Sequence, residues 1–133
     1  MSVASTPLLL RRALQLDAAA SGGMALLAIA AAEPLGGLFG LPVELLRYAG
    51  IALVPFVALV LWAATRAPTP GAAVRLIVAA NLAWAAASIG LVLSGWIAPT
   101  TLGVGFVIAQ ATLVAVFAEL QIIGLRKAAP VVA

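Results

Sequence analysis

Apolar residues gather into four long stretches along the chain, and short segments rich in proline and glycine separate them. The stretches cover residues 13–32, 43–65, 72–95 and 100–125. Each reaches the roughly 20 residues that a helix needs to cross a hydrocarbon core about 30 Å thick. The pattern therefore predicts an all-α integral membrane protein, in which four transmembrane helices form one bundle and one domain over residues 1–133.

The connection between the first two stretches differs from the others because it is itself apolar. It has the sequence EPLGGLFGLP over residues 33–42. Its prolines and glycines end the neighbouring helices. We expect this segment to lie against lipid headgroups or to cap one end of the bundle.

Composition restricts the classes of function. Hydrophobic residues make up 65% of the chain and charged residues 8%, which leaves too few polar groups to coat a soluble domain, so lipid must cover the surface. Histidine and cysteine are absent, and the four acidic residues are spread along the chain. We therefore expect no metal site and no cofactor. The seven basic residues are not clustered in one patch, which argues against a nucleic-acid partner.

The basic residues also predict an orientation, because cationic segments resist translocation and stay in the cytoplasm. Arg47 is the single basic residue expected on one side of the membrane. The other side holds Arg11, Arg12, Arg66, Arg75, Arg126 and Lys127. We therefore place both termini of this multi-pass protein in the cytoplasm. A cleaved signal peptide is the competing interpretation of residues 11–32, but Asp17 interrupts the apolar stretch that such a peptide needs.

Polar residues inside the apolar stretches are rare and face protein or a cavity, and four of them form a candidate group near the midplane. They are Asn81, Trp84, Ser88 and Gln110. One interpretation is a ligand pocket near the midplane, opened by a kink at Pro55. The other is purely structural: Gln110 accepts the indole N–H of Trp84, and Asn81 bonds to a neighbouring helix. We favour the structural interpretation.

Asp17 and Glu119 place two carboxylates one to two turns inside the cytoplasmic boundary. They are candidates for a proton or cation site, because an acid at membrane depth is costly and typically belongs to an ion pathway or a proton relay. Alternatively they form a layer of ion pairs with the long side chains of Arg66, Arg75 or Arg126. We favour the ion pairs.

Small residues at helical spacing predict close packing between helices in the membrane. Such runs are Ser21-Ala25-Ala28-Ala32, Ala79-Ala83-Ala87, Ala86-Gly90-Ser94 and Gly105-Ala109. The two halves also correspond in part, since Arg11 precedes Asp17 by the same six residues that separate Arg75 from Asn81. Two tandem helical hairpins, related by an axis along the membrane normal, would produce this likeness.

Two resemblances add to these inferences. The segment LRRALQLD over residues 10–17, Asn81 with Trp84, and FAELQ over residues 117–121 followed by Gly124-Leu125-Arg126 resemble small four-span bacterial inner-membrane proteins with no established activity. That resemblance implies a multi-pass protein of the bacterial inner (cytoplasmic) membrane. In size and span number the chain is also similar to small multidrug resistance transporters, which have an essential acid in the first helix. Asp17 takes a comparable place, but it stands nearer the end of the helix than that family's glutamate.

Three classes of function follow. We favour a non-enzymatic accessory or scaffold protein that acts through helix contacts in the lipid bilayer, with a protein partner or as a homo-oligomer. The alternative is a transporter or ligand-binding bundle, proton-coupled or not, with a polar pocket at the midplane. A lipid- or quinone-modifying enzyme is disfavoured, because without histidine or cysteine its acid–base chemistry would depend on Asp17 and Glu119 alone.

Overall fold

Five helices make up the computed structural model, which describes residues 6–128. They are α1 (Leu8–Ala30), α2 (Ala32–Phe39), α3 (Val43–Thr65), α4 (Gly71–Ser94) and α5 (Thr101–Ala128). The four long helices have 23, 23, 24 and 28 residues and are apolar enough to cross a membrane. The all-helical fold class is therefore confirmed, and a multi-pass membrane protein is the architecture that fits these helices.

The ends of the long helices differ modestly from the predicted ones. α1 begins at Leu8 instead of residue 13, because Pro7 fixes a backbone suited to the first turn and its carbonyl accepts the N–H of Arg11 at 3.1 Å. The apolar pattern missed this turn since Arg11 and Arg12 interrupt it. α5 continues to Ala128, and its last turn holds Arg126 and Lys127, whose charges complement a helix C-terminus.

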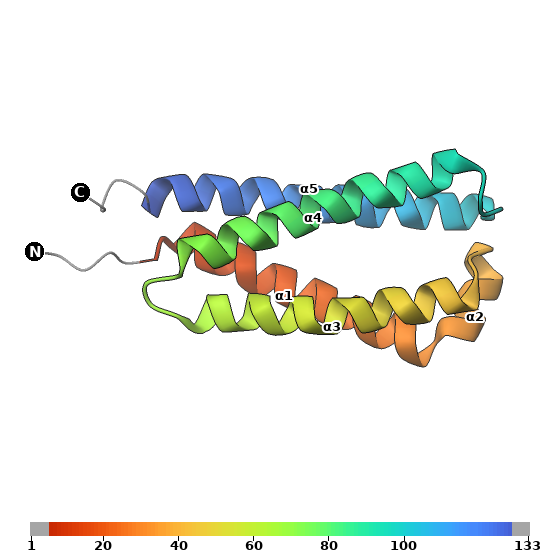
Figure 1. Cartoon of the computed structure of the whole chain (residues 1–133), viewed down its shortest axis with the longest axis horizontal. Helices are drawn as coiled ribbons and strands as arrows, with labels where there is room; N and C mark the ends of the chain where they lie inside the picture. The colour runs from red at the N-terminus through yellow and green to blue at the C-terminus, as the bar shows by residue number, and fades with distance from the viewer. Residues whose placement is uncertain (1–5, 129–133) are drawn as a thin grey trace, which may run out of the picture.

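The apolar connection of residues 33–42 is mostly the short helix α2, which lies at one end of the bundle (Figure 1). Its last residue, Phe39, stacks its ring on Phe106 of α5, with centroids 4.4 Å apart. The Phe39 carbonyl also accepts the N–H of Thr100 at 2.9 Å. α2 ends at Gly40, whose φ of 65° is unfavourable for other residues. This segment therefore ties the first hairpin to the second.

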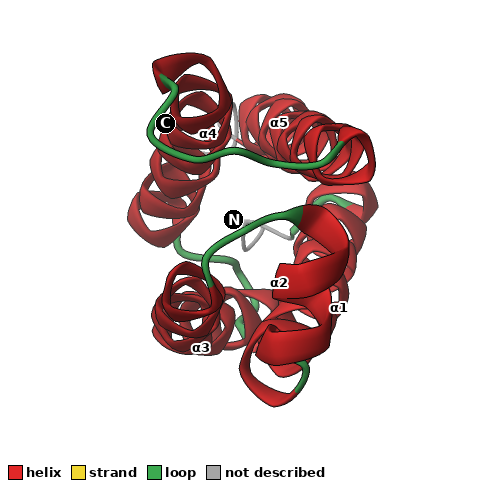
Figure 2. Ribbon diagram, turned by 90° about the vertical axis from the view of Figure 1, so that its right-hand side faces the viewer, coloured by secondary structure: helices red, strands yellow, loops and turns green. Residues whose placement is uncertain are grey.

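The long helices form two antiparallel hairpins, α1 with α3 and α4 with α5 (Figures 1 and 2). The hairpins join mainly through α1 and α5, whereas α3 and α4 touch each other much less. The start of α1 and the end of α5 lie at the same end of the bundle (Figure 1). This arrangement agrees with the predicted pair of tandem hairpins.

Small residues bring α1 close to its neighbours. The run Ser21, Ala25, Ala28 and Ala32 is buried as predicted, and Gly50 of α3 packs on it: a Cβ at Gly50 would lie 3.0 Å from the Cβ of Ala28. The small runs of α4 and α5 do not serve packing within this chain, because every residue in them is exposed. α4 turns a different face inward, with the buried residues Val74, Ile77, Val78 and Asn81.

The apolar core is divided between the two ends of the bundle. Near the basic residues, all four long helices contribute to one cluster, made of Leu10, Leu14, Ala18, Val60, Ala63, Ala64, Val74, Ile77, Val78 and Ala118. A smaller cluster, made of Ala32, Leu41, Leu46 and Val107, lies near α2. The region between these clusters is less tightly filled, and Trp84 and Gln110 line it.

Gly124 is a position where added volume should disturb the packing of α5 against α1. A Cβ there would lie 2.7 Å from the Cβ and 2.8 Å from the Cα of Leu10 in α1. We expect Gly124→Ala to lower the free energy of unfolding by about 1–3 kcal/mol, because two backbones would have to move apart. Titration with a denaturing detergent, followed by circular dichroism, measures this change. Gly105→Ala in the same helix is the control, since nothing lies within 4 Å of its Cβ position; equal effects would contradict the packing described.

Candidate functional site

Four polar side chains from three helices meet inside the bundle. They are Asp17 and Ser21 of α1, Asn81 of α4 and Gln121 of α5. Asp17 and Gln121 have no solvent-accessible surface, and Asn81 is 3% exposed. Such burial is tolerated only when the groups bond to one another. We call these four residues the polar cluster.

Every hydrogen bond to Asp17 is donated toward its carboxylate. Ser21 Oγ donates to Oδ1 at 2.9 Å, and Oδ2 accepts from Asn81 Nδ2 and Gln121 Nε2, both at 2.7 Å. Asn81 Nδ2 also donates to Gln121 Oε1 at 3.2 Å, which closes a triangle of side chains. An ionised carboxylate can only accept hydrogen bonds. The polar cluster therefore satisfies this acid with three neutral donors.

Helical spacing explains why Asp17 and Ser21 act together, since residues four apart lie one above the other on a helix. The same inward face of α1 carries Leu10, Leu14 and Ala18, all buried. On α5, Gln121 shares the buried face with Phe117, Ala118 and Gly124. Apolar neighbours on each helix thus turn the polar side chains inward.

Within residues 6–128, Asp17 and Glu119 do not form the expected layer of ion pairs. Among residues 6–128, Asp17 and Glu119 have no basic side chain within 4.0 Å. Glu119, Arg75 and Arg126 lie on the exposed surface. Arg66 is also exposed, and its guanidinium lies 5.2 Å above the ring of Trp62. These four residues therefore stay apart from the polar cluster.

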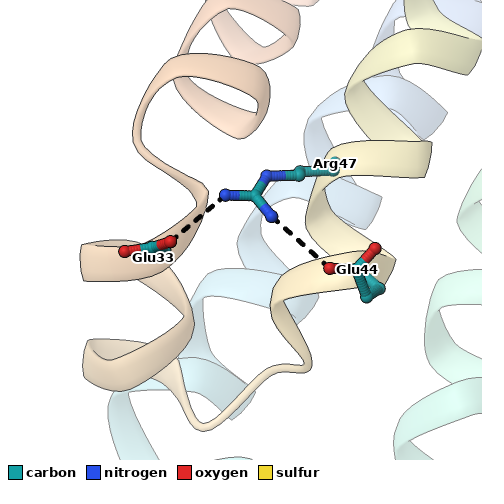
Figure 3. Close-up of polar contacts among 3 residues, drawn as sticks. All are labelled: Glu33, Glu44 and Arg47. Carbon is teal, nitrogen blue, oxygen red and sulfur yellow. Dashed lines mark hydrogen bonds and ion pairs between the residues drawn. The ribbon is translucent and has the colours of Figure 1, made fainter.

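Other charged side chains act at the ends of helices. Arg11 donates to the carbonyl of Ala64 at 2.6 Å and to that of Arg66 at 3.4 Å, so it covers the C-terminus of α3. At the opposite end of the bundle, Arg47 bridges Glu33 at 3.3 Å and Glu44 at 3.4 Å (Figure 3). All three side chains of that bridge are substantially exposed, which makes its contribution to stability small.

Trp84 and Gln110 form a separate pair between α4 and α5. The indole Nε1 donates to Gln110 Oε1 at 3.0 Å, the partner that the structural interpretation expects. Gln110 Nε2 donates to the carbonyl of Val107 at 2.9 Å, and Ser88 Oγ donates to that of Trp84 at 2.7 Å. Ser88 thus bonds within its own helix, whereas the Trp84–Gln110 bond joins two helices of the same hairpin.

A cavity of about 240 Å³ adjoins the polar cluster, between the two hairpins. Ser21 and Asn81 form its polar side, next to Trp84 and Gln110. Apolar groups cover the rest, with Met24, Phe56 and Phe117 the largest among them. Asp17 lies behind Ser21 and Asn81 and does not line the cavity. The midplane pocket anticipated around Asn81, Trp84 and Gln110 thus has a counterpart in the structure.

A second cavity of about 390 Å³ continues from the first toward α2. Both are lined by Met24, Leu53, Trp84 and Gln110, so they form one cleft. The second part is almost wholly apolar; its walls include Leu41, Leu45, Leu46, Leu91, Phe106 and Val107, with Ser88 at one side. Known ligand pockets have volumes of roughly 300–1,000 Å³ and similarly apolar walls. We call the two parts the inner cavity and the outer cavity.

Helical spacing placed Ser21 on the same helix face as Asp17 and Gln121 on the same face as Gln110, but it did not assign either residue to the site. Ser21 lies one turn after Asp17, and Gln121 lies three turns after Gln110 on α5. Those spacings show that the residues share a face of a helix, but they do not show which faces meet. No three histidine, cysteine or acidic residues come together within residues 6–128 to hold a metal ion.

Comparison with protein-family models, with curated protein sequences and with solved structures gives no match to this chain. The resemblance to small four-span bacterial inner-membrane proteins therefore stays a prediction. The site must be interpreted from its own geometry.

Gln121 offers a direct test of the polar cluster. We expect Gln121→Leu to lower the free energy of unfolding by about 1–3 kcal/mol, because Asp17 loses a donor and Asn81 loses an acceptor in a buried place. Denaturant titration of the protein in detergent micelles measures this change. Gln15→Leu makes the same replacement at an exposed position of α1 and should change stability by less than about 0.5 kcal/mol. Similar losses for both variants would contradict a structural role for the cluster.

Proposed function

We propose that this protein binds a small, largely apolar molecule inside the membrane and does so without catalysing a reaction. The observation that supports the proposal is the cleft between the hairpins, which has a long apolar part and one polar side formed by Ser21 and Asn81. Apolar walls with a few convergent polar groups are the usual composition of ligand sites.

This proposal departs from the scaffold interpretation that the sequence favours. The scaffold interpretation expects Asp17 and Glu119 to be paired within the protein and an alanine-rich face to be exposed for a partner. α4 exposes such a face, with Ala79, Ala83 and Ala87, but neither acid forms an ion pair within residues 6–128. Here the four long helices are packed together near the basic end, and a cleft remains toward α2. Asp17 is bonded to neutral partners next to that cleft. Both features favour a bundle that contains a ligand.

A ligand dissolved in the bilayer has a short route into this site. The inner cavity is lined by Ala52 and Phe56 of α3 and by Ala80 and Trp84 of α4, and these two helices make few contacts with each other. We propose that the ligand enters sideways from the lipid, between α3 and α4. Such entry exchanges one apolar environment for another, so the polar end of the ligand provides most of the specificity.

The distribution of charge supports an orientation in which the basic end faces the cytoplasm. Arg11, Arg66, Arg75, Arg126 and Lys127 belong to helix ends at one end of the bundle (Figure 1). The other end holds one basic residue, Arg47, and it is bridged to two glutamates (Figure 3). We therefore propose four crossings of a bacterial inner membrane, with both termini in the cytoplasm.

Reporter fusions test this topology. A reporter that is active only in the cytoplasm should be active when fused to either terminus and inactive when inserted between α4 and α5, at residues 96–99, because that loop lies at the opposite end of the helices. A periplasmic reporter should show the reverse pattern. Opposite locations for the two termini would exclude an even number of crossings and would contradict the proposed topology.

Filling the cleft tests the binding function. Ala80 lines the inner cavity, so Ala80→Phe should displace the ligand, whereas Ala79→Phe places the same ring on the exposed face of α4. We expect mass spectrometry of purified protein to find a small molecule with the wild type and Ala79→Phe and to lose it with Ala80→Phe. Circular dichroism checks that both variants fold. An empty wild-type protein, or one purified with a stoichiometric protein partner instead, would contradict the proposal and favour the scaffold interpretation.

A further inference from the structure

We propose that the cleft selects a neutral single-chain lipid whose head donates a hydrogen bond, a long-chain alcohol in the simplest case. The hydroxyl group would donate to Asn81 Oδ1 in the inner cavity, and the chain would lie in the outer cavity. This inference rests on the proposed binding function and adds the chemical class of the ligand.

The hydrogen bonds of the polar cluster fix how the amide of Asn81 is turned. Its Nδ2 lies 2.7 Å from Asp17 Oδ2 and 3.2 Å from Gln121 Oε1, so both amide protons have an acceptor. Two acceptors around one atom identify that atom as the nitrogen. The carbonyl oxygen, Oδ1, is therefore the end of the amide that the cluster leaves free.

This orientation holds for either protonation state of Asp17. Its Oδ2 lies 2.7 Å from two amide nitrogens, neither of which can accept a proton. A proton on the carboxyl group would therefore lie on Oδ1, where Ser21 Oγ at 2.9 Å can accept it, and Oδ2 would still accept from Asn81. The preference for a donating head thus does not depend on a charge on Asp17.

Asn81 Oδ1 is an acceptor without a partner inside the bundle. It accepts no hydrogen bond from residues 6–128, although the residue is only 3% exposed. Every completely buried side-chain nitrogen or oxygen in that part of the chain has a partner, so Oδ1 keeps some accessible surface. That surface faces the inner cavity, which Asn81 lines. An acceptor left open in an apolar place selects a ligand that donates a hydrogen bond.

The rest of the lining favours a neutral head. Among residues 6–128, no charged side chain lines either cavity. An ionised head would lose its hydration there without contacting a counter-ion, and an anionic head would also bring its lone pairs against Asn81 Oδ1. A hydroxyl group has one proton to donate, and the open acceptor of Asn81 satisfies it.

The length of the cleft specifies the apolar part of the molecule. Along α4 the lining residues run from Asn81 to Leu91, which is about 15 Å at 1.5 Å per residue. Beyond Trp84 the walls are almost wholly apolar, and the hydroxyl of Ser88 is bonded within its own helix. An elongated space of about 390 Å³ suits one chain.

A pair of probes that differ in one proton tests the proposal. Dodecanol and dodecyl methyl ether share the chain, but the ether cannot donate a hydrogen bond. Each is added to protein in lipid nanodiscs, and the signal is the fluorescence of Trp84, which lines both cavities, in a Trp62→Phe, Trp96→Phe background. We expect dodecanol to bind at least about tenfold more tightly than the ether, because only the alcohol satisfies Asn81 Oδ1.

Dodecanoate is the third probe and should not bind, because its head is anionic. Each affinity is corrected for partitioning of the probe into empty nanodiscs. The comparison of the three probes needs no variant of the polar cluster, so it decides the preference even where a cluster variant fails to fold.

Asn81→Leu removes the open acceptor at nearly constant side-chain size. We expect this variant to bind dodecanol and the ether with similar affinity. Gln121→Leu is the matched control, since it removes another amide bonded to Asp17 Oδ2, but Gln121 lines neither cavity. It should keep the preference for dodecanol. Circular dichroism checks that both variants fold.

The outcomes separate this proposal from the binding function on which it rests. If dodecanol binds no more tightly than the ether while Ala80→Phe blocks both, the preference for a donor is wrong and the binding function stands. If dodecanoate binds as tightly as dodecanol, the neutral head is wrong. If Asn81→Leu and Gln121→Leu reduce the preference equally, the role of Asn81 Oδ1 is wrong. If Ala80→Phe leaves the binding of every probe unchanged, both proposals fail.

Discussion

A carboxylate in the interior of an apolar bundle must receive hydrogen bonds, and the need to supply them to Asp17 constrains how the helices face one another. Water is scarce at this depth and no cation pairs with the acid in the structure, so the donors must come from other side chains. α1 supplies Ser21, α4 supplies Asn81 and α5 supplies Gln121. Rotating α4 or α5 by a quarter turn would remove one of these donors, and rotating α1 would turn the carboxylate away from both Asn81 and Gln121. The polar cluster therefore fixes the rotation of three helices that apolar packing alone would fix weakly.

The same cluster brings together positions that correspond in the two halves of the chain. Asp17 and Asn81 each lie six residues after an arginine at the start of a hairpin, and their side chains meet at 2.7 Å. Two hairpins related by an axis through the bundle would place equivalent inward residues near that axis. An acid and an amide at such a place form a hydrogen bond, whereas two acids would repel each other. This difference between the halves makes the interior asymmetric, with the acid on α1 and the amide on α4.

Packing and binding are divided along the length of the bundle. Alanine, valine and leucine from all four long helices fill the basic end, while α2 joins the hairpins at the other end through Phe39 and Phe106. Between them the cleft is bounded by α3 and α4, which touch each other little. A bundle closed at both ends can keep such a cleft without collapsing, since the hydrophobic effect does not drive helices together inside lipid. The polar cluster then gives the cleft one polar side.

The sequence by itself determined the elements and the asymmetry of charge. Four apolar stretches of sufficient length, ended by proline and glycine, specify four long helices. The pattern missed the first turn of α1, where Arg11 and Arg12 follow three leucines, and the short helix α2. It also marked Asn81, Trp84, Gln110 and Asp17 as unusual, because polar groups are costly in apolar segments. The folded arrangement alone decided which of these residues meet. Asp17 bonds to Asn81 and Gln121 rather than to arginine. The small residues of α4 face outward, which the sequence could not show because α4 is apolar on every side apart from Asn81 and a few neighbours. In such a helix no hydrophobic periodicity records which face turns inward, so its rotation follows from contacts with residues distant in the chain.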